Sequence, residues 1–330
     1  MQFKQLLYII IIAFIITMVL GPLIIPHLKK LKVGQMIRED GPKSHKSKRG
    51  TPTMGGIIII ASIFATSLTA GIIDNDLIIA LVATLAFGLI GFIDDFIKIV
   101  LKRSLGLRAY QKMALQLIVA SVLAIYQANS SIIGTRIIIP FIQGSIEIGN
   151  IVIPQYFDLG VFFVPFTVLV VVAIVNAVNL TDGLDGLATG VTLIVAAFFT
   201  LIAFNWGYTS LAIFAGALTG SCLGFLRYNS HPAQIFMGDT GSLALGGAIA
   251  AVAVLMNITL IIPIVGGIFF AETISVIIQV ISYKTTGKRV FKMSPLHHHY
   301  ELSGWAETKI VVVFWIITVV LCLLGVIALS

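Results

Sequence analysis

Several acidic residues of this 330-residue chain stand in short motifs whose chemistry suits phosphate groups. Asp94 and Asp95 close an apolar run in GFIDDFIK, where an expected helix C-terminus disfavours each anion by about 0.3–1 kcal/mol. Carboxylate oxygens suit Mg²⁺, and substrate phosphates can complete its octahedral shell. We therefore interpret the pair as lying near a cation. The simpler interpretation is a solvated pair that Lys98, four residues after Asp94, stabilises by about 0.2–0.5 kcal/mol.

Amides and carboxylates gather at the end of a later apolar run, in NAVNLTDGLDGLA. Asn176, Asn179 and Asp182 are spaced three apart, which puts them on one side of a helix, and Asp185 follows in the turn. Because buried amides need hydrogen-bond partners, these residues are candidates for substrate binding. The alternative is that they only end the helix at two glycines, although a turn needs a single such residue.

The motif FMGDTGS places Asp239 at the start of another expected helix. An aspartate there can serve simply as the N-cap. The free N–H groups and the positive end of the helix dipole can instead hold phosphate oxygens, while Asp239 ligates a metal that bridges them. Phe236, the first residue of this motif, is expected either to stack on a nucleotide base or to anchor the loop to the membrane.

Three consecutive histidines, His297, His298 and His299, lie in the last polar segment, KTTGKRVFKMSPLHHHYELSGW. Adjacent side chains do not converge as spaced zinc ligands do, and no cysteine accompanies them. Imidazoles that bind phosphate or orient a sugar fit better, with a solvated loop as the alternative. Lys48 and Thr53, in GPKSHKSKRGTPTMGG, lie where an anionic nucleotide could be held, although the basic run also suits a topology signal.

The composition excludes a soluble core, because 58% of the residues are hydrophobic and only 11% are charged, against about 25% in soluble domains. About ten apolar runs approach the roughly 20 residues that a helix needs to cross a membrane. They cover residues 5–26, 54–71, 76–93, 111–128, 161–179, 187–206, 210–227, 241–257, 259–282 and 307–329. We predict an all-α integral membrane protein, a single polytopic domain over residues 1–330.

Lys and Arg fix the expected orientation. All but Lys4 and Arg136 of the 21 basic residues fall on one side, which the positive-inside rule makes cytoplasmic. Both termini are then extracytoplasmic, and the catalytic segments are the cytoplasmic loops 27–53, 94–110, 180–187, 228–240 and 283–306. This asymmetry accounts for most of the net charge of +7, so nucleic-acid binding is not needed to explain it.

Two further features concern the outer face and the lipid. Apolar alternation around glycines in the outer segment predicts a small β-hairpin near residues 130–155. Pro263 with the Gly266 and Gly267 pair predicts a kink in the ninth helix, which would open a groove for a lipid tail. Cys222 and Cys322 lie in apolar helices and predict neither a disulfide nor a zinc site.

Over almost the whole chain, the motifs resemble those of the polyprenyl-phosphate N-acetylhexosamine-1-phosphate transferases. DDFIK, NLTDGLDGLA and FMGDTGS are similar to motifs of the wider superfamily, whereas GTPTMGG at 50–56 and KMSPLHHHYELSGW at 292–305 resemble the phospho-N-acetylmuramoyl-pentapeptide transferase (MraY) branch. The resemblance implies transfer of phospho-MurNAc-pentapeptide from UDP-MurNAc-pentapeptide to undecaprenyl phosphate. The products would be UMP and lipid I of peptidoglycan synthesis, made at the cytoplasmic face of a bacterial plasma membrane.

The same resemblance implies a Mg²⁺ cofactor held by Asp239 with Asn179, and a homodimer among the expected partners. Asp94 or Asp95 would deprotonate the acceptor phosphate, with Lys98 and His298 in the catalytic set. Substrate binding would fall to a wider group: Lys48, Thr53, Asn176, Asn179, Asp182, Asp185, Phe236, His297 and His299. We favour direct attack by the lipid phosphate over a phospho-Asp intermediate, because a metal-bound carboxylate is a poor nucleophile.

Two alternatives stay open. The donor could be a UDP-N-acetylglucosamine type of sugar nucleotide, which donor competition would reveal. A transporter, the more remote alternative, would place ionisable groups near the membrane midplane, often within inverted repeats. In this chain only Glu272 lies clearly within an expected span.

Overall fold

The computed structural model describes residues 1–30, 48, 50–100, 106–129, 133–148 and 151–330. Within these residues nine helices are long and apolar enough to cross a membrane. They are α1 (Phe3–Lys30), α3 (Asn75–Val100), α4 (Ala109–Ala128), α5 (Phe163–Thr181), α6 (Leu187–Asn205), α7 (Thr209–Asn229), α8 (Gly238–Leu255), α10 (Gly267–Thr286) and α12 (Glu307–Leu329). The expected span 54–71 is α2 (Gly56–Thr69), whose 14 residues fall short of the length that a straight crossing needs.

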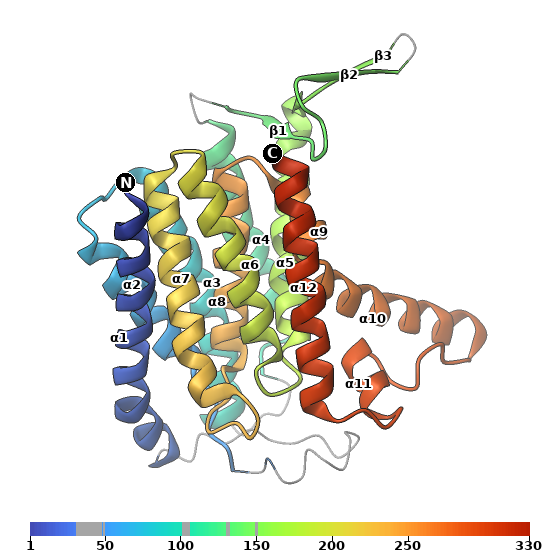
Figure 1. Cartoon of the computed structure of the whole chain (residues 1–330). Coiled ribbons are helices and arrows are strands. Elements are labelled where there is room, and N and C mark those ends of the chain that lie inside the picture. Colours follow the sequence, from blue (N-terminus) through green and yellow to red (C-terminus); the bar gives the residue numbers. More distant parts are fainter. Residues whose placement is uncertain (31–47, 49, 101–105, 130–132, 149–150) are drawn as a thin grey trace.

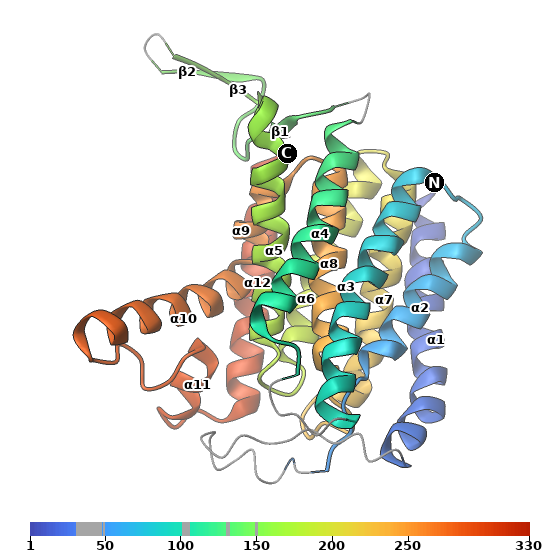
Figure 2. The same ribbon diagram turned by 180° about the vertical axis from the view of Figure 1, so that it is seen from behind.

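Helix α8 is the central element of the bundle, with α3 and α4 on one side and α6 and α7 on the other (Figures 1 and 2). Its most apolar 18-residue window is 89% buried, against 28% for α1 and 33% for α12. A helix buried on all sides is expected to be apolar all round, and α8 is also rich in small residues that allow close packing. A Cβ at Gly247 would lie 2.4 Å from Phe87 Cδ2.

The kink predicted in the ninth span is confirmed as a full break. A short 3₁₀ turn η3 (Thr259–Ile261) and α9 (Ile262–Val265) carry Pro263 in their first turn, and Gly266 ends α9 before α10 begins at Gly267. Beyond the break, α10 leaves the bundle sideways (Figure 1). Apolar side chains such as Ile274 and Ile281 are exposed along it, and a short helix α11 (Leu296–Glu301) follows.

The expected outer hairpin is present as two short antiparallel pairs. β1 (Arg136–Ile138) pairs with β4 (Tyr156–Asp158), and β2 (Ser145–Ile148) pairs with β3 (Ile151–Pro154) in a ribbon that projects from the bundle (Figure 1). A 3₁₀ turn η2 (Gly160–Phe162) leads into α5. Asn257 ties β1 to the bundle, because its carbonyl accepts the Ile138 N–H at 2.9 Å and its amide donates to the Arg136 carbonyl at 2.7 Å.

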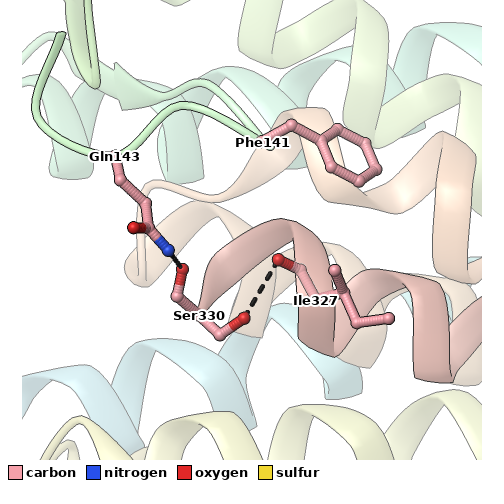
Figure 3. A pocket seen from close by; sticks show the side chains of 4 residues that line it. All are labelled: Phe141, Gln143, Ile327 and Ser330. Carbon is pink, nitrogen blue, oxygen red and sulfur yellow. Dashed lines mark hydrogen bonds between the residues drawn. The ribbon is translucent and has the colours of Figure 1, made fainter.

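A cavity of about 410 Å³ opens at this same end, lined by Phe141, Gln143, Ile327 and Ser330. Gln143 donates a hydrogen bond to the Ser330 carbonyl, which ties the segment between β1 and β2 to the end of α12 (Figure 3). Helix α12 begins at the opposite end of the bundle, where α8 also begins (Figure 1). The cavity is therefore remote from the acidic motifs.

Candidate active site

Asp95 caps the N-terminus of α8 from the neighbouring helix α3. One carboxylate oxygen accepts the Asp239 N–H at 3.2 Å, and the other accepts the Thr240 N–H at 2.9 Å and the Thr240 hydroxyl at 2.7 Å. A carboxylate in this position satisfies unpaired N–H groups and offsets the positive end of the helix dipole. The capping role that Asp239 might have filled is taken by Asp95, so the Asp239 side chain is available for other contacts.

Asp239 lies between two lysines and an amide. Lys98 from α3 and Lys112 from α4 each place an ammonium nitrogen 2.9 Å from its Oδ2. The Asn179 amide of α5 donates to its Oδ1 at 2.9 Å and to the Ser242 hydroxyl at 2.7 Å. Four helices thus meet at one carboxylate whose side chain is only 18% exposed.

Glycines allow these backbones to meet so closely. A Cβ at Gly91 would lie 2.0 Å from the Asp239 carbonyl oxygen, and one at Gly56 would lie 2.2 Å from the Gly241 backbone. Gly238 has φ of +72°, and a Cβ there would lie 2.6 Å from an Asp95 oxygen. Any side chain at these three positions would therefore push Asp239 away from its partners.

Asp94 completes an acidic cluster with Asp95 and Asp239. It is 2% exposed, accepts the Leu107 N–H at 2.7 Å and forms an ion pair with Lys98. One oxygen from each of the three carboxylates lies within 4.8 Å of the others, which is close enough for a shared metal ion.

The chemistry of the donor set fits a hard divalent cation. Both Asp95 oxygens are already used by N–H and hydroxyl donors of α8, so Asp94 and Asp239 are the carboxylates best placed to ligate. The Asn179 amide oxygen, 3.4 Å from Lys112, is a third oxygen at the same place. The lysine ammoniums are the cations in contact with these oxygens here, which shows that the site attracts positive charge.

A second polar cluster surrounds Lys48. Its ammonium donates to Asp185 at 2.7 Å and to Glu307 at 2.6 Å, and the same Glu307 oxygen accepts the Asp185 N–H at 2.8 Å. The other Asp185 oxygen accepts the Ala233 N–H at 3.0 Å and lies 3.3 Å from His231 Nδ1. Burial lowers the pKa of Lys48, but hydrogen bonds and charge attraction to the two carboxylates outweigh it and raise the pKa above its usual value. Lys48 is therefore charged at neutral pH.

Asp182 lies in the turn between the two clusters. Burial, followed by the negative charges of Asp239, Asp95 and Asp185, raises its pKa to about 8. The carboxyl is then protonated near neutral pH, and a protonated carboxyl can donate a hydrogen bond as well as accept one. Such a group can recognise a neutral carbonyl of a nucleotide base without adding repulsion toward its phosphates.

Comparison with known proteins decides the family. Residues 77–257 match the family described as glycosyl transferase family 4, and residues 48–60 match signature 1 of the phospho-N-acetylmuramoyl-pentapeptide-transferases. The phospho-N-acetylmuramoyl-pentapeptide-transferase of Alkaliphilus oremlandii is 72% identical over 330 residues, covering 100% of this chain and 99% of that protein. The chain belongs to the phospho-N-acetylmuramoyl-pentapeptide-transferase family.

Other members of this family are similar over nearly their full length. The phospho-N-acetylmuramoyl-pentapeptide-transferase of Alkaliphilus metalliredigens is 69% identical, with all of both chains covered. That of Clostridioides difficile is 53% identical over 325 residues, covering 98% of each chain. The family signature spans Lys48 and Thr53, so it covers the lysine of the second cluster and the segment that pairs with Phe236 and Met237.

Within this member of the transferase family, Thr53 and Phe236 lie where the GTPTMGG and FMGDTGS motifs pair. The Phe236 N–H donates to the Pro52 carbonyl at 2.8 Å, and the Phe236 carbonyl accepts the Gly55 N–H at 2.9 Å. Thr53 is 7% exposed, and its hydroxyl is 2.7 Å from where a Gly238 Cβ would be. The pairing holds the two motifs beside the start of α8.

Asn176 is placed apart from the acidic cluster. It forms an amide pair with Gln116 of α4, with a contact of 2.6 Å, and also donates to the Val172 carbonyl at 2.8 Å. Asn179, three residues later, is the member of this pair of asparagines that reaches Asp239.

The three histidines lie on α11, where the sequence suggested a loop. His297 is 1% exposed, His298 Nδ1 is 2.8 Å from a Glu301 oxygen, and His299 Nδ1 accepts the Lys292 N–H at 3.2 Å. The Nδ1 atoms of the three histidines therefore meet three different partners, Glu272, Glu301 and the Lys292 N–H.

Lys112 and Glu307 were not among the predicted site residues, although Lys112 contacts Asp239 and Glu307 accepts hydrogen bonds from Lys48 and from the Asp185 N–H. Their sequence contexts, AYQKMA and WAETKI, are ordinary for helix starts, and only the folded contacts single them out. Most of the predicted loop 27–53 lies outside the described residues, including the basic residues between 31 and 47 and Arg49. Lys102 and Arg103 of the predicted loop 94–110 lie outside them as well.

Proposed function

We propose that this protein transfers phospho-MurNAc-pentapeptide from UDP-MurNAc-pentapeptide to undecaprenyl phosphate, forming lipid I and releasing UMP for peptidoglycan synthesis. Full-length relatives that carry this transferase name support the proposal. The observation that carries it is the position of Asp239, at the start of α8 between Lys98 and Lys112 and beside Asp94. A reaction between two phosphates needs cations that offset their repulsion, and an acidic cluster able to hold a metal beside two lysines can supply them.

We place this site at the cytoplasmic face of a bacterial plasma membrane, with both termini outside. Basic residues mark the ends of α1, α3, α7 and α10, as the positive-inside rule requires for a cytoplasmic side. Both chain termini lie at the opposite end of the bundle (Figure 1). An accessibility test on single cysteines introduced at Lys4 and Lys284 would check this orientation.

We further propose that Mg²⁺ is held by Asp239 with the Asn179 amide oxygen. When bound, the ion would neutralise the negative charge that builds up on the reacting phosphoryl group. Lys98 and Lys112 would then turn from Asp239 toward substrate phosphates, because a bound cation competes with them for the same oxygen. Both side chains are long enough to keep their ammoniums in the site.

Asp94 is the better candidate for the base that deprotonates the acceptor phosphate, since Asp95 is occupied in capping α8. We favour direct attack by the lipid phosphate over a phospho-Asp intermediate, because Asp239 is needed as a metal ligand and a metal-bound carboxylate is a poor nucleophile. Lys48, Asp182, Asp185 and Phe236 would bind the uridine end of the donor. His298 and His299 would lie toward its sugar and phosphates.

The decisive test measures UMP release by the purified protein in detergent with UDP-MurNAc-pentapeptide, undecaprenyl phosphate and Mg²⁺. We expect release that requires the lipid, stops with chelator and returns when Mg²⁺ is restored. Release from UDP-N-acetylglucosamine but not from this donor would instead assign the protein to the related sugar branch. No release from either donor would contradict a transferase function and favour transport.

A homodimer is also proposed, on the family resemblance. Sedimentation of the detergent-solubilised protein, with bound detergent subtracted, would give a mass near twice that of the 35.5 kDa chain. A mass of one chain would contradict this part of the proposal.

A further inference from the structure

Glu272 is an ionisable residue in the middle of an apolar helix, and nothing in the proposed reaction uses it. It lies on α10 and its side chain is completely buried, at 0% exposed. An ionisable side chain within a membrane span is costly and is expected to pair with a specific partner. The residue that pairs with Glu272 therefore indicates what Glu272 does.

The partner is His297 of α11. The two Glu272 oxygens lie 3.2 and 3.4 Å from the His297 backbone nitrogen, and one of them lies 3.1 Å from His297 Nδ1. A carboxylate can only accept, so both nitrogens donate to it, and the imidazole is fixed with its proton on Nδ1. His297 is the second residue of α11, where a backbone N–H has no partner within the helix. Glu272 therefore caps α11 and orients its first histidine at once.

The opposite edge of the imidazole faces the donor-binding turn. His297 Nε2 is buried and has no hydrogen-bond partner among the described residues. A Cβ built on Gly183 would lie 2.2 Å from this nitrogen, so the ring packs directly on the Gly183 backbone. Gly183 lies between Asp182 and Asp185, both assigned above to the uridine end of the donor. The imidazole thus fills the space between α10 and this turn.

The positions of His298 and His299 depend on that of His297, because all three lie on α11. The rings of His297 and His298 are 4.2 Å apart, and α11 has only six residues, too few to be stable alone in water. Its position is therefore set by its neighbours: the Glu272 cap and the Gly183 turn at its first turn, and Phe314 of α12 against Tyr300 near its end. A shift of His297 would carry His298 and His299 with it.

We infer that Glu272 and His297 are positioning residues that join the exposed helix α10 to the donor-binding turn and hold α11 between them. The assignment to catalysis rests on the proposed function, but the mechanical link does not. The helix that departs toward the lipid and the turn that faces the nucleotide then move as one unit.

Amide hydrogen exchange on the full-length protein tests the link without substrates. We expect Glu272→Gln to raise exchange by about tenfold in residues 296–301 and also in residues 180–187, which Glu272 does not touch. The matched control is Asp76→Asn, a carboxylate of α3 that accepts a hydrogen bond from Tyr126 and lies at the far end of the bundle. Faster exchange in α11 alone, with the turn unchanged, would overturn the inference.

Kinetics then separate positioning from simple stability. We expect Glu272→Gln and His297→Gln each to lower kcat by about tenfold, and the double variant to be no slower than the worse single variant. Gly183→Ala should lower kcat by a similar factor in the wild-type protein, because the new Cβ would overlap the His297 imidazole. In a His297→Ala background it should cause no further loss, because the imidazole is absent. Multiplicative losses would overturn the link. Wild-type protein that releases no UMP would contradict the proposed function alone, because the exchange result stands without it.

Discussion

Among the described residues, two clusters contain three potential metal ligands each, yet they are built differently. In both Asp94–Asp95–Asp239 and Asp185–His231–Glu307, the ligand atoms lie within 4.8 Å of one another. In the second, Lys48 lies between Asp185 and Glu307, and backbone N–H groups take up Asp185 Oδ2 and Glu307 Oε1. Hydrogen-bond donors of the protein itself, the Lys48 ammonium and two backbone N–H groups, therefore occupy the carboxylates of that cluster.

In the first cluster, backbone N–H groups bind Asp95 and one oxygen of Asp94, whereas Asp239 is held by side chains alone. Two of these side chains are lysines, and one of them, Lys98, is 34% exposed. Acid count alone therefore does not identify a cation site. What distinguishes the two clusters is whether the donors that neutralise the acids are fixed by the fold or can be displaced by a substrate.

The largest effect should come from Asp239→Asn, which keeps the shape of the side chain and removes its charge. We expect kcat to fall by about a thousandfold or more, because a metal ligand and the focus of two lysines are lost together. UMP release at saturating substrates measures it, with Asp158→Asn in the outer segment as the control. Activity restored by excess Mg²⁺ would show that Asp239 affects affinity for the ion alone.

Lys112→Gln should have the next largest effect, with kcat about a hundredfold lower and the KM values little changed. The reason is that the lysine would stabilise charge that develops in the transition state. Lys284→Gln, at the exposed end of α10, is the matched control. A rise in donor KM with normal kcat would move Lys112 from the reaction to ground-state binding.

Glu307→Gln probes the second cluster. The amide still accepts the Asp185 N–H but loses its charge attraction to Lys48, so we expect the KM for the UDP donor to rise about tenfold at nearly normal kcat. Initial rates over a range of donor concentrations give both constants. A loss confined to kcat would place Glu307 in the chemical step and erase the distinction between the clusters.

The smallest effect concerns Asp182, whose pKa of about 8 replaces an ordinary value of 3.8. Between these values the folded protein holds a proton that the unfolded chain has released, so this group makes stability fall as pH rises from about 4 to 8. Asp182→Asn removes that dependence. We measure the melting temperature of the variant minus that of wild type in metal-free buffer. This difference should increase by roughly 2–4 °C from pH 5 to pH 8. A constant difference would mean that Asp182 titrates normally.

Local sequence was sufficient for residues whose motif and helix position are both unusual. Asp94, Asp239, Lys98 and Asn179 were expected together and do converge, because helix ends rich in polar residues mark one face of a membrane bundle. Glycine and proline at 263–267 also located the break before α10.

Long-range packing decided the rest. Asn176 and Asn179 are one helical turn apart on the same face, so periodicity treats them alike; Gln116 of α4 pairs with one and Asp239 of α8 contacts the other. The contacts of Asp95 with the start of α8 join residues 144 and 145 positions apart, so its motif could not predict them. Lys112 and Glu307 carry no local signal, since their partners lie 127 and 122 residues away.

The glycine contacts around Asp239 also bear on how this protein can evolve. At Gly56 and Gly91 even a methyl group would overlap the backbone of α8, so mutation there has almost no tolerated outcome. An inhibitor that contacts Asp239 would therefore meet a carboxylate whose position the organism cannot readily alter. Resistance would have to arise from more distant, replaceable side chains, and it would be correspondingly slower to appear.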